Sequence, residues 1–146
     1  MGQDLHTFDE KGRLTLPARY REALEHGVVI LRGIQQCLWV FTRQEWDSIA
    51  ERMGENLDSL DEDQANIGRH FFAHAADLVP DRQGRVIIPE RLRKYAELDG
   101  EALIIGVNKR LEIWNPDRWN ELDQQVAANR AAMAANLVKA GVRLGI

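Results

Sequence analysis

The residues best suited to chemistry in this sequence form a short turn motif, Asp-x-x-Gly-Arg, that occurs twice. One copy runs from Asp9 to Arg13 and the other from Asp81 to Arg85. In such a turn the aspartate can accept hydrogen bonds from the backbone two residues on, and the glycine supplies a positive φ. Arginine can bind phosphate, or the O6 and N7 atoms of guanine, through two hydrogen bonds, and the backbone amides of a turn can also hold a phosphate. The motif therefore indicates anion binding, whereas an ion pair between its own Asp and Arg would make it a purely structural turn.

Further basic residues accompany both turns. Lys11 lies inside the first turn, and Arg82 lies inside the second, where Gln83 occupies the position equivalent to Lys11. The candidate binding residues are Lys11, Arg13, Arg82 and Arg85, and the residues expected to hold the turns are Asp9, Gly12, Asp81 and Gly84. These residue types alone leave the structural and the anion-binding interpretation equally open.

The two turns belong to an internal repeat that covers most of the chain. The thirteen residues that begin at Asp9 align with the thirteen that begin at Asp81, and six of these positions are identical. A second block of residues is repeated at an offset of 73 positions. It aligns Gly33 with Gly106, Leu38 with Leu111, Val40 with Ile113, Phe41 with Trp114 and Trp46 with Trp119. Agreement of this length predicts two copies of one supersecondary unit.

Each copy predicts the same order of elements. A strand rich in apolar and β-branched residues follows the turn, then a short helix with proline at its first position, then two more strands and a closing helix. In the first copy the strands are Leu14–Leu16, Val28–Leu31 and Leu38–Phe41, and the short helix is Pro17–Leu24. In the second copy the strands are Val86–Ile88, Ala102–Ile105 and Leu111–Trp114, and the short helix is Pro89–Glu97.

The closing helices have clear start signals. Thr42 and Glu45 form a capping box, and Asn115 precedes Pro116 and Asp117 in an N-cap arrangement. We expect the repeated tryptophans to anchor these helices on the sheet, and the repeated glycines at 33 and 106 to lie at the turns between the last two strands of each copy.

Helical patterns also occur between and after the copies. Residues Gln64–Leu78 predict an amphipathic connector helix, and an alanine-rich helix is expected from Trp119 to about Val138. The run from Glu51 to Asp63 holds six acidic residues against one arginine, which is typical of a solvated helix end or loop. The predicted organisation is a first unit at residues 3–48, a helical and acidic linker at 49–74, a second unit at 75–119, and a C-terminal helix and tail at 120–146.

A unit of about 40 residues cannot bury its own sheet face. Two copies can do so by pairing around a pseudo-twofold axis. We therefore expect a single α+β body built from two intertwined hairpin units, with flanking helices.

Catalytic signals are weak in comparison. The sequence contains no phosphate-binding loop, dinucleotide-binding fingerprint, zinc-protease motif or nucleophile elbow. Cys37 has no neighbouring histidine, and a core position on a strand fits it better than a nucleophile. His70 and His74 share a helix face, with Asp77 one turn further, but two histidines alone do not make a metal site. We expect a protein that is not an enzyme, with no cofactor and no metal.

Composition restricts where an anion could bind. The chain of 146 residues has a net charge of −4 and a pI near 5.6, so a nucleic-acid surface would have to be focal rather than spread over the whole protein. No apolar run is long enough to span a membrane, and the N-terminal residues lack a secretory signal. A single cysteine favours a reducing cytosol.

The two Asp-x-x-Gly-Arg turns, each followed by a strand and a proline, together with the paired tryptophans and the histidine before the second copy, resemble the MraZ family. The resemblance covers residues 3–120. It implies two AbrB-like swapped-hairpin units that form one small barrel-like body. The family's DNA-binding determinant, Asp-x-x-x-Arg, matches Asp9 and Arg13 in the first copy and Asp81 and Arg85 in the second. Two features depart from the family: Gln83 replaces a basic residue, and the N-terminus lacks the usual aromatic-Arg-Gly segment.

The resemblance also implies a function. MraZ proteins form rings of about eight or more subunits and bind short G-rich direct repeats in double-stranded promoter DNA of their own operon, within the bacterial division and cell-wall gene cluster. It thus implies a cytoplasmic, nucleoid-associated transcription factor, a repressor, with no membrane partner. The alternative is a protein-interaction or assembly ring that does not bind DNA directly.

Overall fold

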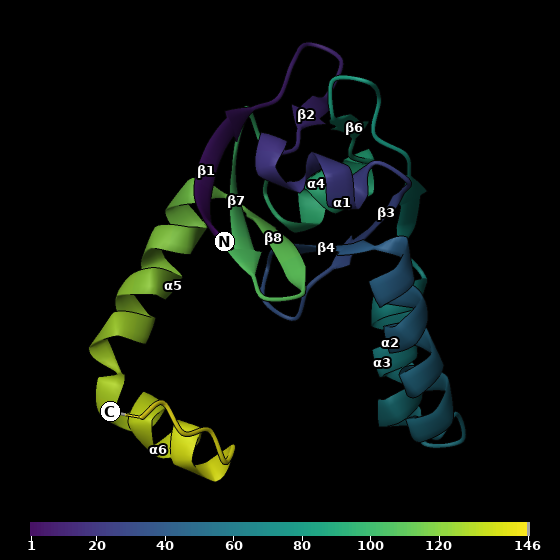
Figure 1. Ribbon diagram of the computed structural model, residues 1–146. Coiled ribbons are helices and arrows are strands. Elements are labelled where there is room, and N and C mark those ends of the chain that lie inside the picture. The colour runs from purple at the N-terminus through teal and green to yellow at the C-terminus, as the bar shows by residue number, and fades with distance from the viewer. Residues whose placement is uncertain (146) are drawn as a thin grey trace. The chain divides into compact units, whose positions relative to one another are not determined.

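The computed structural model describes residues 1–145 and confirms the expected α+β class (Figure 1). The strands are β1 (Gly2–Thr7), β2 (Arg13–Thr15), β3 (Val28–Arg32), β4 (Leu38–Thr42), β5 (Ala76–Leu78), β6 (Arg85–Ile87), β7 (Glu101–Val107) and β8 (Arg110–Trp114). The helices are the 3-10 turn η1 (Ala18–Tyr20), α1 (Arg21–Leu24), α2 (Arg43–Asn56), α3 (Glu62–Phe72), α4 (Glu90–Tyr95), α5 (Pro116–Ala128) and α6 (Arg130–Lys139). The chain divides into two compact units, Met1–Asn115 and Pro116–Ile146.

In the first unit the strands of the two copies are interleaved. Within residues 1–145 the strands form one six-stranded antiparallel sheet, in the order β1-β7-β8-β4-β3-β5, and one separate two-stranded ribbon of β2 and β6. β1 of the first copy pairs with β7 of the second, and β5 of the second pairs with β3 of the first. Neither copy could therefore complete the sheet alone. Because the ribbon pairs only with itself, closure of the strands into a barrel is not confirmed.

The registers show the pseudo-twofold axis directly. In the ribbon, Leu14 lies opposite its repeat equivalent Val86, with Arg13 opposite Ile87 and Thr15 opposite Arg85. In the sheet, β4 and β8 pair symmetrically about Trp39 and Glu112. Side chains alternate between the two faces of a strand, so the inward position of Leu14 and Val86, which are 0% and 3% exposed, places the arginines on the outward face.

Two hydrophobic clusters lie on opposite faces of the sheet. One face packs against the ribbon, α1 and α4, with Leu14, Ile30 and Leu92 among its fully buried members. The other face packs against α2 and α3, which stand together in Figure 1, through a cluster formed by Val29, Leu31, Phe41, Trp46 and Phe71. Trp46 is thus buried on the sheet as predicted.

Several boundaries differ from the sequence expectations. The strand β1 was not predicted. The connector helix ends at Phe72 rather than Leu78, because residues Ala76–Leu78 pair with β3 as β5. Gly106 lies inside β7 rather than in the following turn, opposite Gly2 of β1. A Cβ atom built there would collide with the Tyr20 hydroxyl and lie 2.8 Å from Met1 Cα, so this position needs glycine for space.

The C-terminal unit contains two helices where one continuous helix was predicted. Asn129 separates α5 from α6 and has a non-helical backbone, with φ −99° and ψ 40°. No residue of α5 or α6 is buried within the described chain, and Val126 and Met133 are exposed. No helix among residues 1–145 is long and apolar enough to cross a membrane.

Candidate nucleic-acid interface

The first turn is held by one carboxylate. Asp9 Oδ1 accepts hydrogen bonds from the backbone N–H of Lys11 and of Arg13, each at 2.9 Å, and Oδ2 accepts from Arg13 Nε at 2.6 Å. The turn closes through the backbone, because the N–H of Gly12 donates to the carbonyl of Asp9 at 3.0 Å. Gly12 has φ +76°, which a side chain would make unfavourable.

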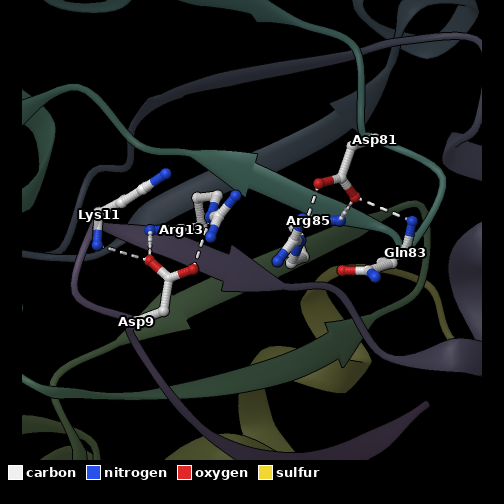
Figure 2. A network of polar contacts seen from close by, with 6 residues as sticks. All are labelled: Asp9, Lys11, Arg13, Asp81, Gln83 and Arg85. Carbon is white, nitrogen blue, oxygen red and sulfur yellow. Dashed lines mark hydrogen bonds and ion pairs between the residues drawn. The ribbon is translucent and has the colours of Figure 1, made fainter.

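The second turn repeats this geometry contact by contact. Asp81 Oδ1 accepts from the backbone N–H of Gln83 and of Arg85 at 2.9 Å, and Oδ2 accepts from Arg85 Nε at 2.8 Å (Figure 2). Gly84 has φ +75°. Both turns thus share one geometry, in which the aspartate accepts from the backbone and from the arginine and the glycine has a positive φ.

The hydrogen bonds keep both carboxylates ionised. The backbone N–H of Arg13 lowers the pKa of Asp9 below its ordinary value of 3.8. Desolvation opposes this shift, and the guanidinium of Arg13 and the N–H of Lys11 lower the pKa further. Asp81 has its pKa lowered in the same way by Arg85 and Gln83. At neutral pH each aspartate is an acceptor that fixes the direction of its arginine.

The Asp–Arg pairs use only one edge of each guanidinium. The side chains of Arg13 and Arg85 are each 28% exposed, and their Nη groups make no hydrogen bond within the part of the chain that the structure describes. Both lie on the outward face of the ribbon, where they are diagonal neighbours about 7–8 Å apart by strand geometry. The structural and the anion-binding interpretation of the turn are therefore compatible: Nε holds the turn while the Nη groups face outward.

The tips of the turns differ between the copies. Lys11 and Arg82 are exposed and form no ion pair among the described residues. The first tip also carries the exposed Glu10, which Arg82 replaces in the second copy. A hollow of about 250 Å³ adjoins the second turn, with Arg82 and Gly84 in its lining. The second turn is thus the more positive of the two.

Sequence reasoning missed two further arginines at these turns. Arg93 of the second copy lies over Gly12, and Arg21 of the first copy lies over Gly84. A signal was present, since Arg21 and Arg93 are one of the six identical pairs in the repeat. Their positions depend on how the ribbon pairs, which the sequence does not display.

Two of the other candidates for chemistry, His70 and Asp77, have structural partners. His70 Nε2 lies 2.9 Å from the carbonyl oxygen of Gly33, and Asp77 pairs with Arg43 at 2.6 Å. No group of three or more potential metal ligands occurs among residues 1–145. Cys37 is fully buried, and burial raises the pKa of its thiol to about 12, so it is not an activated nucleophile.

Comparison with known proteins matches this duplicated architecture to a family. A family model described as "MraZ protein, putative antitoxin-like" matches residues 1–69 and 71–140, one segment for each copy. The chain belongs to the MraZ family. This confirms the resemblance read from the repeated turns.

Curated MraZ relatives align over nearly the whole chain. A protein of Roseiflexus sp. (strain RS-1) is 42% identical over 139 residues, covering 95% of this chain and 96% of the relative. A protein of Carboxydothermus hydrogenoformans is 41% identical over 138 residues, covering 94% and 96%, and one of Syntrophomonas wolfei is 36% identical over 142 residues, covering 97% and 99%. Each is named "Transcriptional regulator MraZ". These names support a role in transcription regulation and not in catalysis.

Proposed function

We propose that this chain binds double-stranded promoter DNA through its two Asp-x-x-Gly-Arg turns and thereby regulates transcription. The observation that carries the proposal is the pair of outward guanidinium groups, Arg13 and Arg85, each locked at Nε by an aspartate and open at its Nη groups. Such a group is already held in place, so binding restricts little further side-chain freedom, and its fork matches phosphate or guanine. Lys11 and Arg82 add positive charge at the tips of the turns.

The distribution of charge is consistent with a focal contact. The acidic run from Glu51 to Asp63 spans the end of α2 and the start of α3. These helices pack on the sheet face opposite the ribbon. The ribbon can therefore approach a polyanion while the acidic surface stays on the far side of the sheet.

One protomer alone would bind weakly. A nanomolar dissociation constant requires about −12 kcal/mol, whereas one bidentate arginine–guanine contact discriminates by about 1–3 kcal/mol. Several protomers that engage repeated short sites together gain affinity through effective concentration. We therefore propose a ring-shaped homo-oligomer that reads short G-rich direct repeats, as the family resemblance implies.

The same resemblance supports the target and the direction of control. We propose that the chain acts on its own promoter in the division and cell-wall gene cluster, as a repressor in the cytoplasm at the nucleoid. How much each turn contributes to binding stays open to experiment, because the uncharged Gln83 occupies the position in the second turn that Lys11 occupies in the first.

Fluorescence anisotropy with a labelled duplex from the region upstream of the gene tests the proposal. The wild-type protein should bind, its affinity should fall steeply as salt is raised, and Arg13→Ala should abolish binding while the protein stays folded. Arg52→Ala is the matched control, because it removes the same charge from α2 on the other side of the sheet. A flat salt response, or normal binding by folded proteins that carry Arg13→Ala and Arg85→Ala, would refute DNA binding by the turns.

An assembly ring without direct DNA binding is the rival function. It predicts oligomers in solution but no complex with the upstream duplex at any salt concentration. Measuring oligomer mass by light scattering on the anisotropy samples separates the two, since only the proposed regulator forms the complex.

A further inference from the structure

The antiparallel pairing of β2 with β6 places the end of each ribbon strand beside the turn of the other copy. The N–H of Leu16, just after β2, donates to the carbonyl of Gly84 at 2.8 Å. The chain that follows β2 therefore starts next to the second turn. By the pseudo-twofold symmetry, the chain that follows β6 starts next to the first turn. The short helix of each copy thus starts beside the turn of the other copy.

One arginine from each short helix uses this position. A Cβ atom built on Gly12 would lie 3.6 Å from Arg93 Cζ and 3.7 Å from each Arg93 Nη atom, so this guanidinium lies flat over the first turn. A Cβ atom built on Gly84 would lie 2.7 Å from Arg21 Nε, so the second turn is covered even more closely. At Gly84 this approach requires glycine for space, whereas at Gly12 a Cβ atom would be in ordinary van der Waals contact with the guanidinium.

The two arginines are positioned but not neutralised. Arg93 Nε donates to the carbonyl of Ile88 at 3.1 Å, which fixes the side chain on its own copy while its Nη atoms reach the other. Neither Arg21 nor Arg93 forms an ion pair in the described chain, and no hydrogen bond of theirs involves an Nη atom there. Arg21 also lines the hollow beside the second turn together with Arg82 and the exposed Glu25.

We propose that each polyanion-binding site is shared between the two copies: Arg93 completes the site of Lys11 and Arg13, and Arg21 completes the site of Arg82 and Arg85. Each added arginine contacts a backbone phosphate of the bound duplex beside the turn that it covers. This inference rests on the proposed DNA binding and adds to it that neither copy holds a complete site. Phosphate contacts of this kind set affinity and register, while the turn arginines are free to contact bases.

Single substitutions measure the contribution of each added arginine. Arg93→Ala and Arg21→Ala should each weaken binding to the upstream duplex about tenfold to a hundredfold, as expected for a lost charged hydrogen bond. Each should also reduce the slope of log affinity against log salt by about 0.9 per protomer engaged. Arg91→Ala is the control, because it removes the same charge from α4 two positions away, on the opposite side of the helix.

A double-mutant cycle tests the exchange between copies. Because Arg13→Ala is expected to abolish binding, the cycle uses lysine at the turn positions, which keeps the charge. Arg93→Ala should be coupled to Arg13→Lys, so that the double variant loses less affinity than the product of the single losses, but it should be independent of Arg85→Lys. Arg21→Ala should show the reverse pattern. Arg93→Lys should restore most of the salt slope, and thermal melting should show the variants folded, which excludes a purely structural role at the Ile88 carbonyl.

The outcomes separate this inference from the proposed function. If the wild type does not bind the duplex, both are wrong. If the wild type binds and Arg13→Ala abolishes binding, but Arg21→Ala and Arg93→Ala behave like Arg91→Ala, the DNA-binding function stands and the shared sites are refuted. Coupling of Arg93 with Arg85 instead of Arg13 would likewise refute the exchange.

Discussion

At the scale of single residues, one aspartate in each turn both builds the loop and directs the arginine. Asp9 accepts two backbone N–H groups with one oxygen and the Nε of Arg13 with the other. A bare carboxylate would repel phosphate, but here its charge is compensated by the guanidinium that it holds. The acid in the motif therefore favours anion binding, because it presents an arginine in a fixed orientation.

The lowered pKa values of the two aspartates make stability depend on pH in an acidic window. The pKa of Asp9 in the folded protein lies below its ordinary value of 3.8, so the ionised carboxylate stabilises the fold. This stabilisation is fully present at pH values above 3.8. The stabilisation is lost as pH falls through the folded-state pKa. Asp9→Asn should therefore lower the melting temperature at pH 7, and the difference from wild type should shrink below pH 3.8.

Thermal melts from pH 2 to pH 7 check this expectation, with Asp47→Asn on the exposed face of α2 as the control. The control shows how much of any difference comes from replacing an exposed carboxylate by an amide. A difference for Asp9→Asn that persists unchanged at pH 2 would contradict the role assigned to the ionised carboxylate.

The two turn glycines provide a matched pair of substitutions. Gly12→Ala and Gly84→Ala each place a side chain at positive φ, which should cost about 1–2 kcal/mol of unfolding free energy. Only the alanine at 84 also displaces a guanidinium, because its Cβ atom would lie 2.7 Å from Arg21 Nε. The Cβ atom of an alanine at 12 would lie 3.6 Å from Arg93 Cζ, which leaves that guanidinium in place. Denaturant unfolding should show similar stability losses, whereas anisotropy should show a larger affinity loss for Gly84→Ala. Equal affinity losses would mean that Arg21 does not contribute to binding.

At the scale of elements, the ribbon of β2 and β6 is the piece on which both turns depend. Its inward residues Leu14 and Val86 face each other on the pseudo-twofold axis and are almost completely buried. Its outward face carries Arg13 and Arg85. The packing of the core thus sets the spacing of the two guanidinium groups.

Substitutions on the two faces of the ribbon should therefore differ in how much they destabilise the protein. Leu14→Ala leaves a cavity at the centre of the core and should cost about 2–5 kcal/mol of unfolding free energy. Ile87→Ala, at a position 57% exposed on the outward face, should cost no more than about 1 kcal/mol. Urea denaturation of both variants measures the difference. A similar cost for the two would show that the ribbon does not pack inward as described.

Most elements could be predicted from the sequence because their signals are local. The turns, the strands β2–β4 and β6–β8, and the starts of the short helices follow from glycine, proline and β-branched residues. The strand β1 could not be predicted because it contains few apolar residues, and β5 could not because its three residues also fit the helical pattern before them. Both exist because β7 and β3 offer them backbone partners. The same limit applies to the site: the Asp–Arg pairs lie within five residues, whereas the approach of Arg93 to Gly12 depends on long-range register.

At the scale of the whole molecule, the repeat gives one protomer two nearly equivalent basic turns on a chain with a net charge of −4. The two turns differ at their tips, with Glu10 and Lys11 in one and Arg82 and Gln83 in the other. A protomer can therefore bind with a preferred orientation although its fold is pseudo-symmetric. Direct repeats in DNA present sites that all point the same way, which suits an oriented protomer better than a symmetric one.

The spacing of DNA repeats should consequently control affinity. The test compares a duplex that has one G-rich repeat with duplexes that have two or more direct repeats about 10 base pairs, or one helical turn, apart. If several protomers of one oligomer bind together, the duplexes with several repeats should bind at least about a hundredfold more tightly. Inserting about 5 base pairs between the repeats turns the second site to the opposite side of the DNA and should remove this gain, whereas inserting about 10 should restore part of it. Anisotropy titrations of these duplexes at one salt concentration measure the effect. Affinity that is independent of repeat number and spacing would show that protomers bind singly, and the multivalent explanation of tight binding would then be wrong.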